Sequence, residues 1–190
     1  MTVIHLVRHG RTAANAGGRL QGRLDLPIDD VGETQVAALS AAFARIDRLI
    51  SSPSLRARQT AAVFGVDVEL DERWLEMDFG EFDGAQMSEL PREVLRRWMT
   101  SPDFTPEGGE SLSALAARVN SACDELAVAA RDQVIVVVTH ATPIKVAMAW
   151  ALGVGADIVW RSQVDHARIT TLTVGDRGPA LAGFNVAPSR

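Results

Sequence analysis

The chain has 190 residues, of which 47% are hydrophobic and 23% charged, a composition typical of one folded domain with a sizeable core. Its formal net charge of −5 disfavours a nucleic-acid partner. The first residues lack the pattern of a signal peptide, and no apolar stretch approaches the roughly 18 residues of a membrane span. With Cys123 as its single cysteine, the sequence predicts a cytoplasmic protein without membrane association.

Strands and helices alternate along the first half of the chain. Residues 3–7, which are apolar except for His5, predict a strand. A helix is expected over 30–46, because apolar residues recur there at helical spacing and Asp29 or Asp30 can cap its start. The elements expected next are a strand over 48–51, a helix over 54–64 and a strand over 66–70.

The second half contains the most apolar strand. Residues 134–138 are apolar at every position, which is typical of a parallel strand buried on both faces. Helices are expected before it, over 111–130, and after it, from near Pro143 to near Gly153. A hairpin is expected from the strands 169–174 and 180–186.

This alternation predicts a three-layer αβα sandwich. No repeat, linker or low-complexity tract divides residues 1–190, so we expect one domain. The least regular segment, about 77–110, is expected to form a small lid-like insertion over the sheet. An apolar helical stripe within it makes Trp98 and the neighbouring Arg97 candidates for ligand contact.

Basic side chains follow three of the predicted strands. Arg8 and His9 end the first strand, and Arg56 and Arg58 follow the second. His140 ends the buried strand, just before a helix. Taken singly, each could be an ordinary loop or surface residue, and Arg58 is expected at the surface. If the strands are parallel, these groups meet at one sheet edge and form a pocket for a phosphate dianion beside a helix N-terminus.

The first of these junctions has chemistry suited to phosphate. Arg8 is a permanent, forked cation that matches phosphate oxygens. His9 is a nitrogen nucleophile that is neutral near pH 7 and able to carry a covalent group. Gly10 allows the backbone to turn and to approach an anion closely.

Six segments, in order along the chain, resemble the histidine phosphatase superfamily, also called phosphoglycerate-mutase-like. They are RHGRTAAN (8–15), QGRLDLPID (21–29), SSPSLRARQTA (51–61), LEMDFGEFDG (75–84), GGES (108–111) and VTHATPIK (138–145). The resemblance runs from residue 3 to about 152. It implies an αβα sandwich with a mixed, mostly parallel sheet and a phosphohistidine mechanism without metal or other cofactor.

By match to the family's motifs, the resemblance implies that His9 is the nucleophile. It further implies a phosphate pocket completed by Arg8, Arg56 and His140, a lining loop with Asn15, Gln21 and Gly22, and Glu76 as proton donor. Ala141 stands where many relatives have glycine. Its backbone N–H is still available, so we expect the phosphate pocket to be retained.

Glu110 is the rival acid. An alkoxide is a poor leaving group, so the acid must be protonated when substrate is bound. Glu110 opens the helix expected from residue 111, whose dipole favours the ionised carboxylate. The sequence therefore favours Glu76 as the acid and gives Glu110 a positioning or helix-starting role.

The remaining histidines and the cysteine are expected to be structural. His5 lies inside the first strand, and Cys123 lies on the apolar stripe of a helix. His166 precedes the last hairpin, where contact with the pocket is the alternative to a structural role. The four histidines show no metal-binding pair, so no metal site is expected.

Three functions remain open. The preferred one is a phosphatase that hydrolyses a small phosphomonoester through phospho-His9. A phosphoglycerate mutase is the second, but segment 77–110 is too small for the cover that keeps water from a mutase phosphoenzyme. A non-catalytic phosphate-binding module is disfavoured because His9, Glu76 and His140 are all present. The sequence leaves the physiological substrate and oligomeric state open, and its apolar C-terminal hairpin is consistent with a homodimer.

Overall fold

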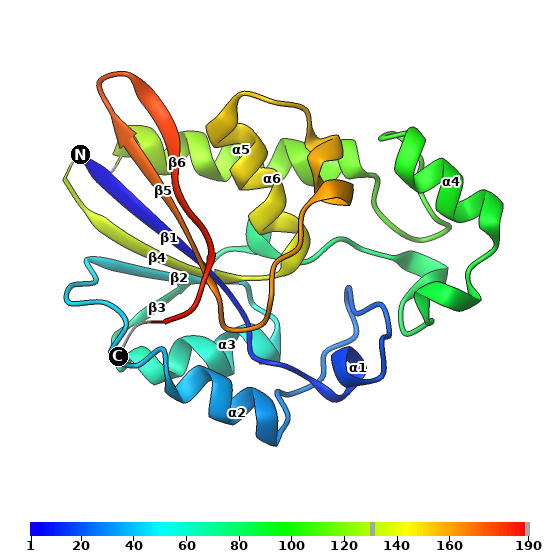
Figure 1. The fold of residues 1–190 in the computed structure, drawn as a ribbon, viewed down its shortest axis with the longest axis horizontal. Helices are drawn as coiled ribbons and strands as arrows, with labels where there is room; N and C mark the ends of the chain where they lie inside the picture. The colour runs from blue at the N-terminus through cyan, green and yellow to red at the C-terminus, as the bar shows by residue number, and fades with distance from the viewer. Residues whose placement is uncertain (130–131, 189–190) are drawn as a thin grey trace.

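Six strands form one mixed sheet in the computed structural model, which describes residues 1–129 and 132–188. They are β1 (Thr2–Arg8), β2 (Arg48–Ser51), β3 (Val68–Leu70), β4 (Val134–Thr139), β5 (Ile169–Gly175) and β6 (Gly178–Val186). Their order across the sheet is β3-β2-β4-β1-β5-β6. The first four in this order run parallel, β5 runs antiparallel to β1, and β6 runs antiparallel to β5 (Figure 1).

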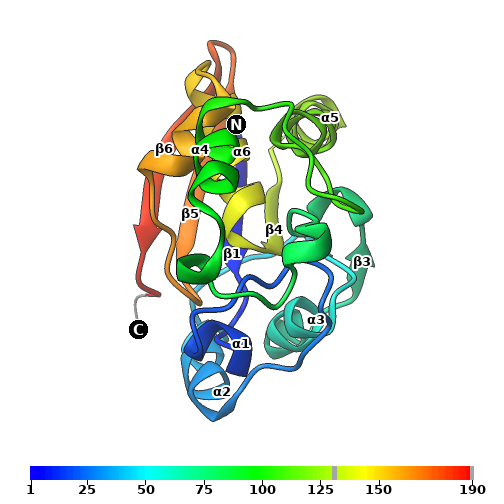
Figure 2. The same ribbon diagram turned by 90° about the vertical axis from the view of Figure 1, so that its right-hand side faces the viewer.

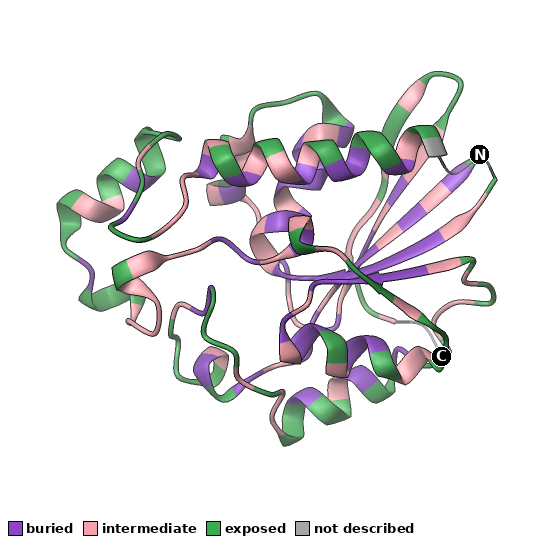
Figure 3. Cartoon of the chain, turned by 180° about the vertical axis from the view of Figure 1, so that it is seen from behind, coloured by how far each residue is buried: buried purple, intermediate pink, exposed green. Residues whose placement is uncertain are grey.

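Helices cover both faces of this sheet. The helices α2 (Asp30–Ala37) and α3 (Leu55–Ala61) pack on one face, and α5 (Leu112–Ala129) and α6 (Ala141–Leu152) pack on the other (Figure 1). Alternate residues of β4 point to opposite layers, since Val136 belongs to the α2–α3 core and Val137 to the α5–α6 core. The central strands β2, β4 and β1 are mostly buried, whereas the edge strands β3 and β6 and the outer helix surfaces are largely exposed or half-buried (Figure 3). The predicted αβα sandwich is therefore confirmed.

The remaining elements are short. They are α1 (Ala13–Ala16), α4 (Arg92–Thr100) and the 3-10 turns η1 (Ala62–Phe64), η2 (Glu72–Trp74), η3 (Gly80–Phe82), η4 (Met87–Glu89) and η5 (Ala156–Arg161). No helix in the described part of the chain is long and apolar enough to cross a bilayer.

The helix predicted over 30–46 is much shorter in the structure and ends at Ala37. Beyond it the backbone continues in tighter turns, with Leu39 N–H donating to Val36 O and Ala42 N–H to Leu39 O, both at 2.9 Å. Leu39 still packs in the same core as Val36. Tight turns place apolar residues at nearly the same spacing as an α-helix does. The apolar pattern over residues 30–46 therefore predicted a helix longer than the one observed.

Two other boundaries also differ from the prediction. The strand expected over 66–70 begins only at Val68. The helix expected from near Pro143 begins at Ala141, and Pro143 is tolerated because a first-turn residue needs no N–H. Its end agrees with the prediction, since Gly153 adopts the left-handed conformation, with a φ of 65°, that terminates many helices.

Segment 77–110 lies at one end of the molecule, beside the loop of residues 17–24. Backbone hydrogen bonds join the two, because Leu20 N–H donates to Ala85 O and Gly84 N–H to Leu20 O, both at 2.8 Å. Viewed from that end, α4 and α1 flank the carboxyl ends of the central strands (Figure 2). The segment therefore borders the edge where the predicted basic groups emerge.

Candidate active site

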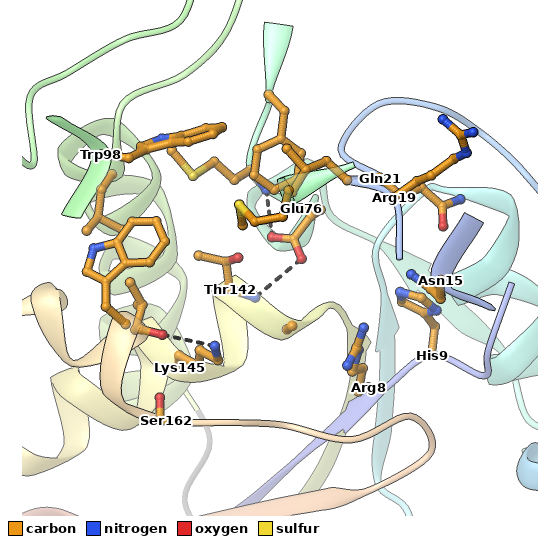
Figure 4. Close-up of a pocket in the computed structure, with 18 residues that line it drawn as sticks. Arg8, His9, Asn15, Arg19, Gln21, Glu76, Trp98, Thr142, Lys145 and Ser162 are labelled. Carbon is orange, nitrogen blue, oxygen red and sulfur yellow. Dashed lines mark hydrogen bonds between the residues drawn. The ribbon is translucent and has the colours of Figure 1, made fainter. Parts of the chain in front are cut away.

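A pocket of about 340 Å³ opens at that edge. Its lining includes six residues predicted from the sequence, namely Arg8, His9, Asn15, Gln21, Glu76 and Ala141 (Figure 4). Arg56 and His140 lie fully buried and do not line it. The His140 ring is nevertheless in contact with the His9 ring, with 5.0 Å between centroids. The structure thus brings the two imidazoles together.

The orientation of His9 leaves one nitrogen free for chemistry. Its Nδ1 lies 2.7 Å from Gly10 O. Because a carbonyl can only accept, Nδ1 carries the proton and Nε2 keeps its lone pair. Burial first, and then the charges of Arg56 and Arg8, hold the pKa of His9 well below its usual 6.5. His9 is therefore a neutral nucleophile near pH 7.

Gly10 has a different role from the one expected. A Cβ on Gly10 would lie 2.7 Å from Val36 Cγ1 and 2.9 Å from Gly32 O. The glycine thus allows the β1 terminus to pack against α2. No positive φ is involved, since Gly10 is not among the described glycines in the left-handed region.

Arg56 is a buried cation held entirely by neutral acceptors. Its Nη1 donates to Leu24 O at 3.0 Å and its Nη2 to Gly22 O at 2.9 Å. Its Nε donates to His140 Nδ1 at 3.3 Å. His140 Nε2 must then carry the proton, which it donates to Ser52 Oγ at 2.8 Å. Burial and the Arg56 charge keep the pKa of His140 well below 6.5, so this ring is also neutral.

Arg8 presents an unused donor. Its Nη1 donates to Val164 O at 2.5 Å, while its buried Nε has no hydrogen-bond partner. Neither Arg8 nor Arg56 forms an ion pair with a carboxylate in the described part of the chain. Buried cations are normally paired, so the two arginines leave uncompensated positive charge beside His9.

Glu76 enters the same pocket from the segment between β3 and α4. It is only 7% exposed. Its Oε1 accepts from Met77 N–H at 2.8 Å, and its Oε2 accepts from Thr142 N–H at 3.3 Å, in the first turn of α6. Figure 4 shows its carboxylate directed into the cavity that Arg8 and His9 line. This placement suits a group that exchanges a proton with a bound ester.

Glu110 lies outside the pocket lining and is engaged by Arg118, a residue that the sequence analysis missed. Arg118 Nε and Nη2 donate to its two carboxylate oxygens at 2.7 and 2.8 Å. Arg118 also donates to the carbonyls of Leu75, at 2.7 Å, and Glu76, at 3.0 Å. The geometry therefore supports the positioning role preferred for Glu110.

The lining loop is held by contacts within itself. Asn15 and Gln21 line the pocket, and the Thr12 hydroxyl lies 3.0 Å from Asn15 Oδ1 and 2.6 Å from Gln21 Oε1. Gly22 does not line the pocket, and its carbonyl instead holds Arg56. A Cβ there would lie 2.4 Å from Met77 O, so only glycine fits.

Asp83 was also missed, although it falls within the LEMDFGEFDG segment. Its carboxylate accepts from the backbone N–H groups of Gly22, Arg23 and Leu24, at 2.7, 2.8 and 2.7 Å. Since Gly22 and Leu24 supply the carbonyls that hold Arg56, Asp83 shapes the Arg56 cradle through the backbone.

The other sequence candidates lie around the site. Trp98 lines the pocket, whereas Arg97 is exposed. The Cζ atom of Arg97 lies 4.3 Å from the centre of the Phe104 ring. His166 contacts the His9 ring, with 5.8 Å between centroids, but does not line the pocket. Burial lowers the pKa of His166 to about 4. Exposed Arg58 and the buried thiol of Cys123 are as expected.

A mixed αβα sheet with two imidazoles and two guanidiniums at one edge defines a phosphate-binding class of α/β protein. A family model described as the histidine phosphatase superfamily (branch 1) matches residues 4–187. The chain belongs to this superfamily, as its sequence motifs predicted.

Known relatives extend over nearly the whole chain. A phosphoserine phosphatase of Hydrogenobacter thermophilus is 29% identical over 196 residues, which cover 98% of this chain and 93% of that protein. The structure of a phosphoserine phosphatase from Entamoeba histolytica with bound phosphoserine has a TM-score of 0.89 and 26% identity, over 97% of each chain. A bifunctional protein of Mycobacterium tuberculosis is 34% identical over 179 residues. The matched region covers 89% of this chain but only 49%, about half, of that protein.

Proposed function

We propose that this chain is a phosphatase that hydrolyses small phosphomonoesters through a phosphohistidine at His9. One observation carries the proposal. His9 Nε2 is unprotonated in a pocket that Arg8 and Glu76 also line, and the charge of the buried Arg56 acts on the same His9 ring. A nucleophile, positive charge beside it and an acid are the parts that phosphoryl transfer to histidine requires.

The first step transfers the phosphoryl group to the enzyme. His9 Nε2 attacks phosphorus in line, and the bond from phosphorus to the ester oxygen breaks. Protonated Glu76 gives its proton to that oxygen, so the product leaves as a neutral alcohol. Arg8 binds an equatorial oxygen, where transition-state charge accumulates, and the buried Arg56 guanidinium, held against His140, adds positive charge next to His9.

The second step releases phosphate. A water molecule attacks the phosphorus of phospho-His9, and the Glu76 carboxylate takes its proton. The phosphorus–nitrogen bond breaks, which frees inorganic phosphate and restores neutral His9 and protonated Glu76. Apart from the ester itself, the cycle as written uses only water and side chains of this protein.

Hydrolysis is favoured over the mutase reaction by two observations. The relatives compared above include proteins named as phosphoserine phosphatases. The cover over the pocket is also small, because α4 and its neighbouring turns contribute only Met77, Phe79, Met87 and Trp98 to the lining. Water can therefore reach the phosphoenzyme. The cytoplasmic location and the homodimer stay predictions.

A panel of phosphomonoesters assayed with wild type and His9→Ala tests the proposal. We expect phosphate release by the wild type and near-complete loss in the variant, since the attacking atom is removed. Equal rates in the two proteins would overturn the assignment of His9. Trapping of a phosphorylated wild-type chain by acid quench, and its absence in His9→Ala, would identify the intermediate directly.

A second assay separates hydrolysis from isomerisation. The wild type is incubated with 3-phosphoglycerate and bisphosphoglycerate, and both free phosphate and 2-phosphoglycerate are measured. Phosphate release without isomerisation supports the phosphatase. Rapid formation of 2-phosphoglycerate without free phosphate would instead identify a mutase.

A further inference from the structure

Lys145 is the only lysine among the 19 lysines and arginines of the chain. It lies on α6, four residues after Ala141, and therefore on the same face of that helix. Lys145 is partly buried and lines the candidate active-site pocket. The proposed phosphatase cycle gives Lys145 no role, because it uses only His9, Glu76 and the charges of Arg8 and Arg56.

The Lys145 ammonium has unused donors. Its Nζ donates one hydrogen bond, to Val159 O at 2.9 Å, although an ammonium carries three N–H groups. No carboxylate in the described part of the chain lies at ion-pair distance from it. Burial lowers the pKa of Lys145, which shows that part of its hydration has been lost. A partly dehydrated cation of this kind gains most from an anionic ligand.

The charge of the pocket exceeds what one phosphate needs. Its lining includes Arg8, Arg19 and Lys145 but only one acidic residue, Glu76, and none of the three cations forms an ion pair within the described residues. Figure 4 shows Arg8 and His9 together on one side of the cavity and Lys145 on another, beside Thr142 and Ser162. The pocket thus has a second cationic position besides the phosphate site.

Much of the remaining pocket lining is apolar. It includes the side chains of Met77, Phe79, Trp98, Val159 and Trp160. The organic part of a ligand can pack against these apolar side chains while charged groups at its two ends bind the cations of the pocket. Polar recognition at one defined point of an apolar pocket is the usual basis of substrate selectivity.

We propose that Lys145 binds a second anionic group, a carboxylate or a further phosphate, on the organic part of the phosphomonoester substrate. The proposal rests on the proposed phosphatase function, since it places the scissile phosphate at His9. It names Lys145 as a specificity-determining residue and anionic phosphomonoesters as the substrate class.

Three matched esters test this preference. In place of the carboxylate of 3-phosphoglycerate, glycerol 3-phosphate has a neutral hydroxymethyl group, and glycerol 1,3-bisphosphate has a phosphorylated hydroxymethyl group. Each is measured as a competitive inhibitor of p-nitrophenyl phosphate hydrolysis, which works whether or not the ester is itself cleaved. We expect at least one anionic ester to bind the wild type about tenfold more tightly than glycerol 3-phosphate, as for a charged hydrogen bond.

Lys145→Met should remove that advantage, and Lys145→Arg should retain part of it. Arg161→Met is the matched control, because Arg161 is exposed on η5 beside the pocket but does not line it. It should keep the wild-type preference. A wild type without preference, or a Lys145→Met variant that retains it, would overturn the proposal. Which anionic ester is preferred decides between carboxylate and phosphate.

A readout independent of turnover keeps the two proposals distinguishable. Because Lys145 is the only side-chain amine, acylation by an N-hydroxysuccinimide ester followed by peptide mass analysis reports on it alone. In His9→Ala, the preferred anionic ester should protect Lys145 from acylation more than glycerol 3-phosphate does. Protection without any wild-type hydrolysis would reject the phosphatase but keep the Lys145 site. Hydrolysis of p-nitrophenyl phosphate without selective protection would reject the Lys145 site alone.

Discussion

Two buried histidines in contact have opposite tautomers in this pocket. His9 carries its proton on Nδ1, because Gly10 O accepts from that atom. His140 carries its proton on Nε2, because Arg56 donates to Nδ1. The neighbouring hydrogen bond thus makes one ring a nucleophile and leaves the other as a neutral partner of the Arg56 guanidinium.

Glu76→Gln tests the proton donor at the scale of one residue. The amide keeps the size of the side chain but cannot deliver the proton that an alkoxide needs. We expect alkyl phosphates to be hydrolysed about 10²- to 10⁴-fold more slowly. Hydrolysis of p-nitrophenyl phosphate should fall much less, since its leaving group needs little protonation.

Glu110→Gln is the comparison for this assay, because Glu110 is the other candidate acid but lies outside the pocket lining and reaches Glu76 only through Arg118. For each variant, the rates of hydrolysis of an alkyl phosphate and of p-nitrophenyl phosphate are measured side by side. The comparison separates loss of proton transfer, which slows mainly the alkyl ester, from a general loss of activity. Equal slowing of both esters by Glu76→Gln would assign Glu76 a positioning role. An unchanged rate would point to a different acid.

At the scale of elements, α5 fixes the segment that carries Glu76. Arg118 on α5 donates to three carbonyls of that segment, those of Arg73, Leu75 and Glu76. The carboxylate of Glu110 holds the guanidinium in place with two hydrogen bonds. Planar, bidentate geometry of this kind restricts the side chain to one orientation.

Arg118→Met should therefore reproduce part of the Glu76→Gln pattern. We expect alkyl phosphates to be slowed about tenfold more than p-nitrophenyl phosphate, because a displaced acid no longer reaches the leaving oxygen. Arg96→Met on α4 is the control, since Arg96 is exposed and pairs only with Glu93. A general loss of activity, without dependence on the leaving group, would contradict the positioning role of Arg118.

The loop of residues 21–24 is a second element that depends on a distant side chain. Asp83→Ala removes the acceptor of three loop N–H groups and should loosen the carbonyls that hold Arg56. We expect inhibition by inorganic phosphate to weaken about tenfold, whichever ester is the substrate. Unchanged phosphate inhibition in a folded variant would show that Arg56 does not rely on Asp83.

For the whole molecule, burial lowers the pKa of all four histidines. The unfolded chain, with histidine values near 6.5, therefore binds more protons than the folded chain as pH falls below that value. The histidines should make stability decrease as pH falls from about 7 toward about 5, before carboxylates with pKa values lowered below 4.5 begin to titrate.

Urea unfolding across this range measures the effect. His166→Asn should make the pH dependence less steep, since it removes one of the groups that take up a proton on unfolding. The wild type at about pH 7 provides the reference. A free energy of unfolding that stays flat between about pH 7 and pH 5 would contradict the expectation.

The layers of the fold and most site residues could be predicted because their signals are local. The buried strand 134–138 is apolar at every position, and Arg8, His9, Arg56, Glu76 and His140 lie in short motifs. Helix length was less predictable, because the turns after Ala37 satisfy the same apolar spacing as a helix.

The sequence by itself determined which chemical groups are present and the class of fold that carries them, since periodicity and motifs are properties of neighbouring residues. Only the tertiary structure decided how those groups are used. The tautomers of His9 and His140, the Arg118 contacts of the Glu76 segment and the unpaired Lys145 depend on partners far apart in the chain. Hydrogen bonds and burial fix protonation and orientation, and both exist only once the chain has folded.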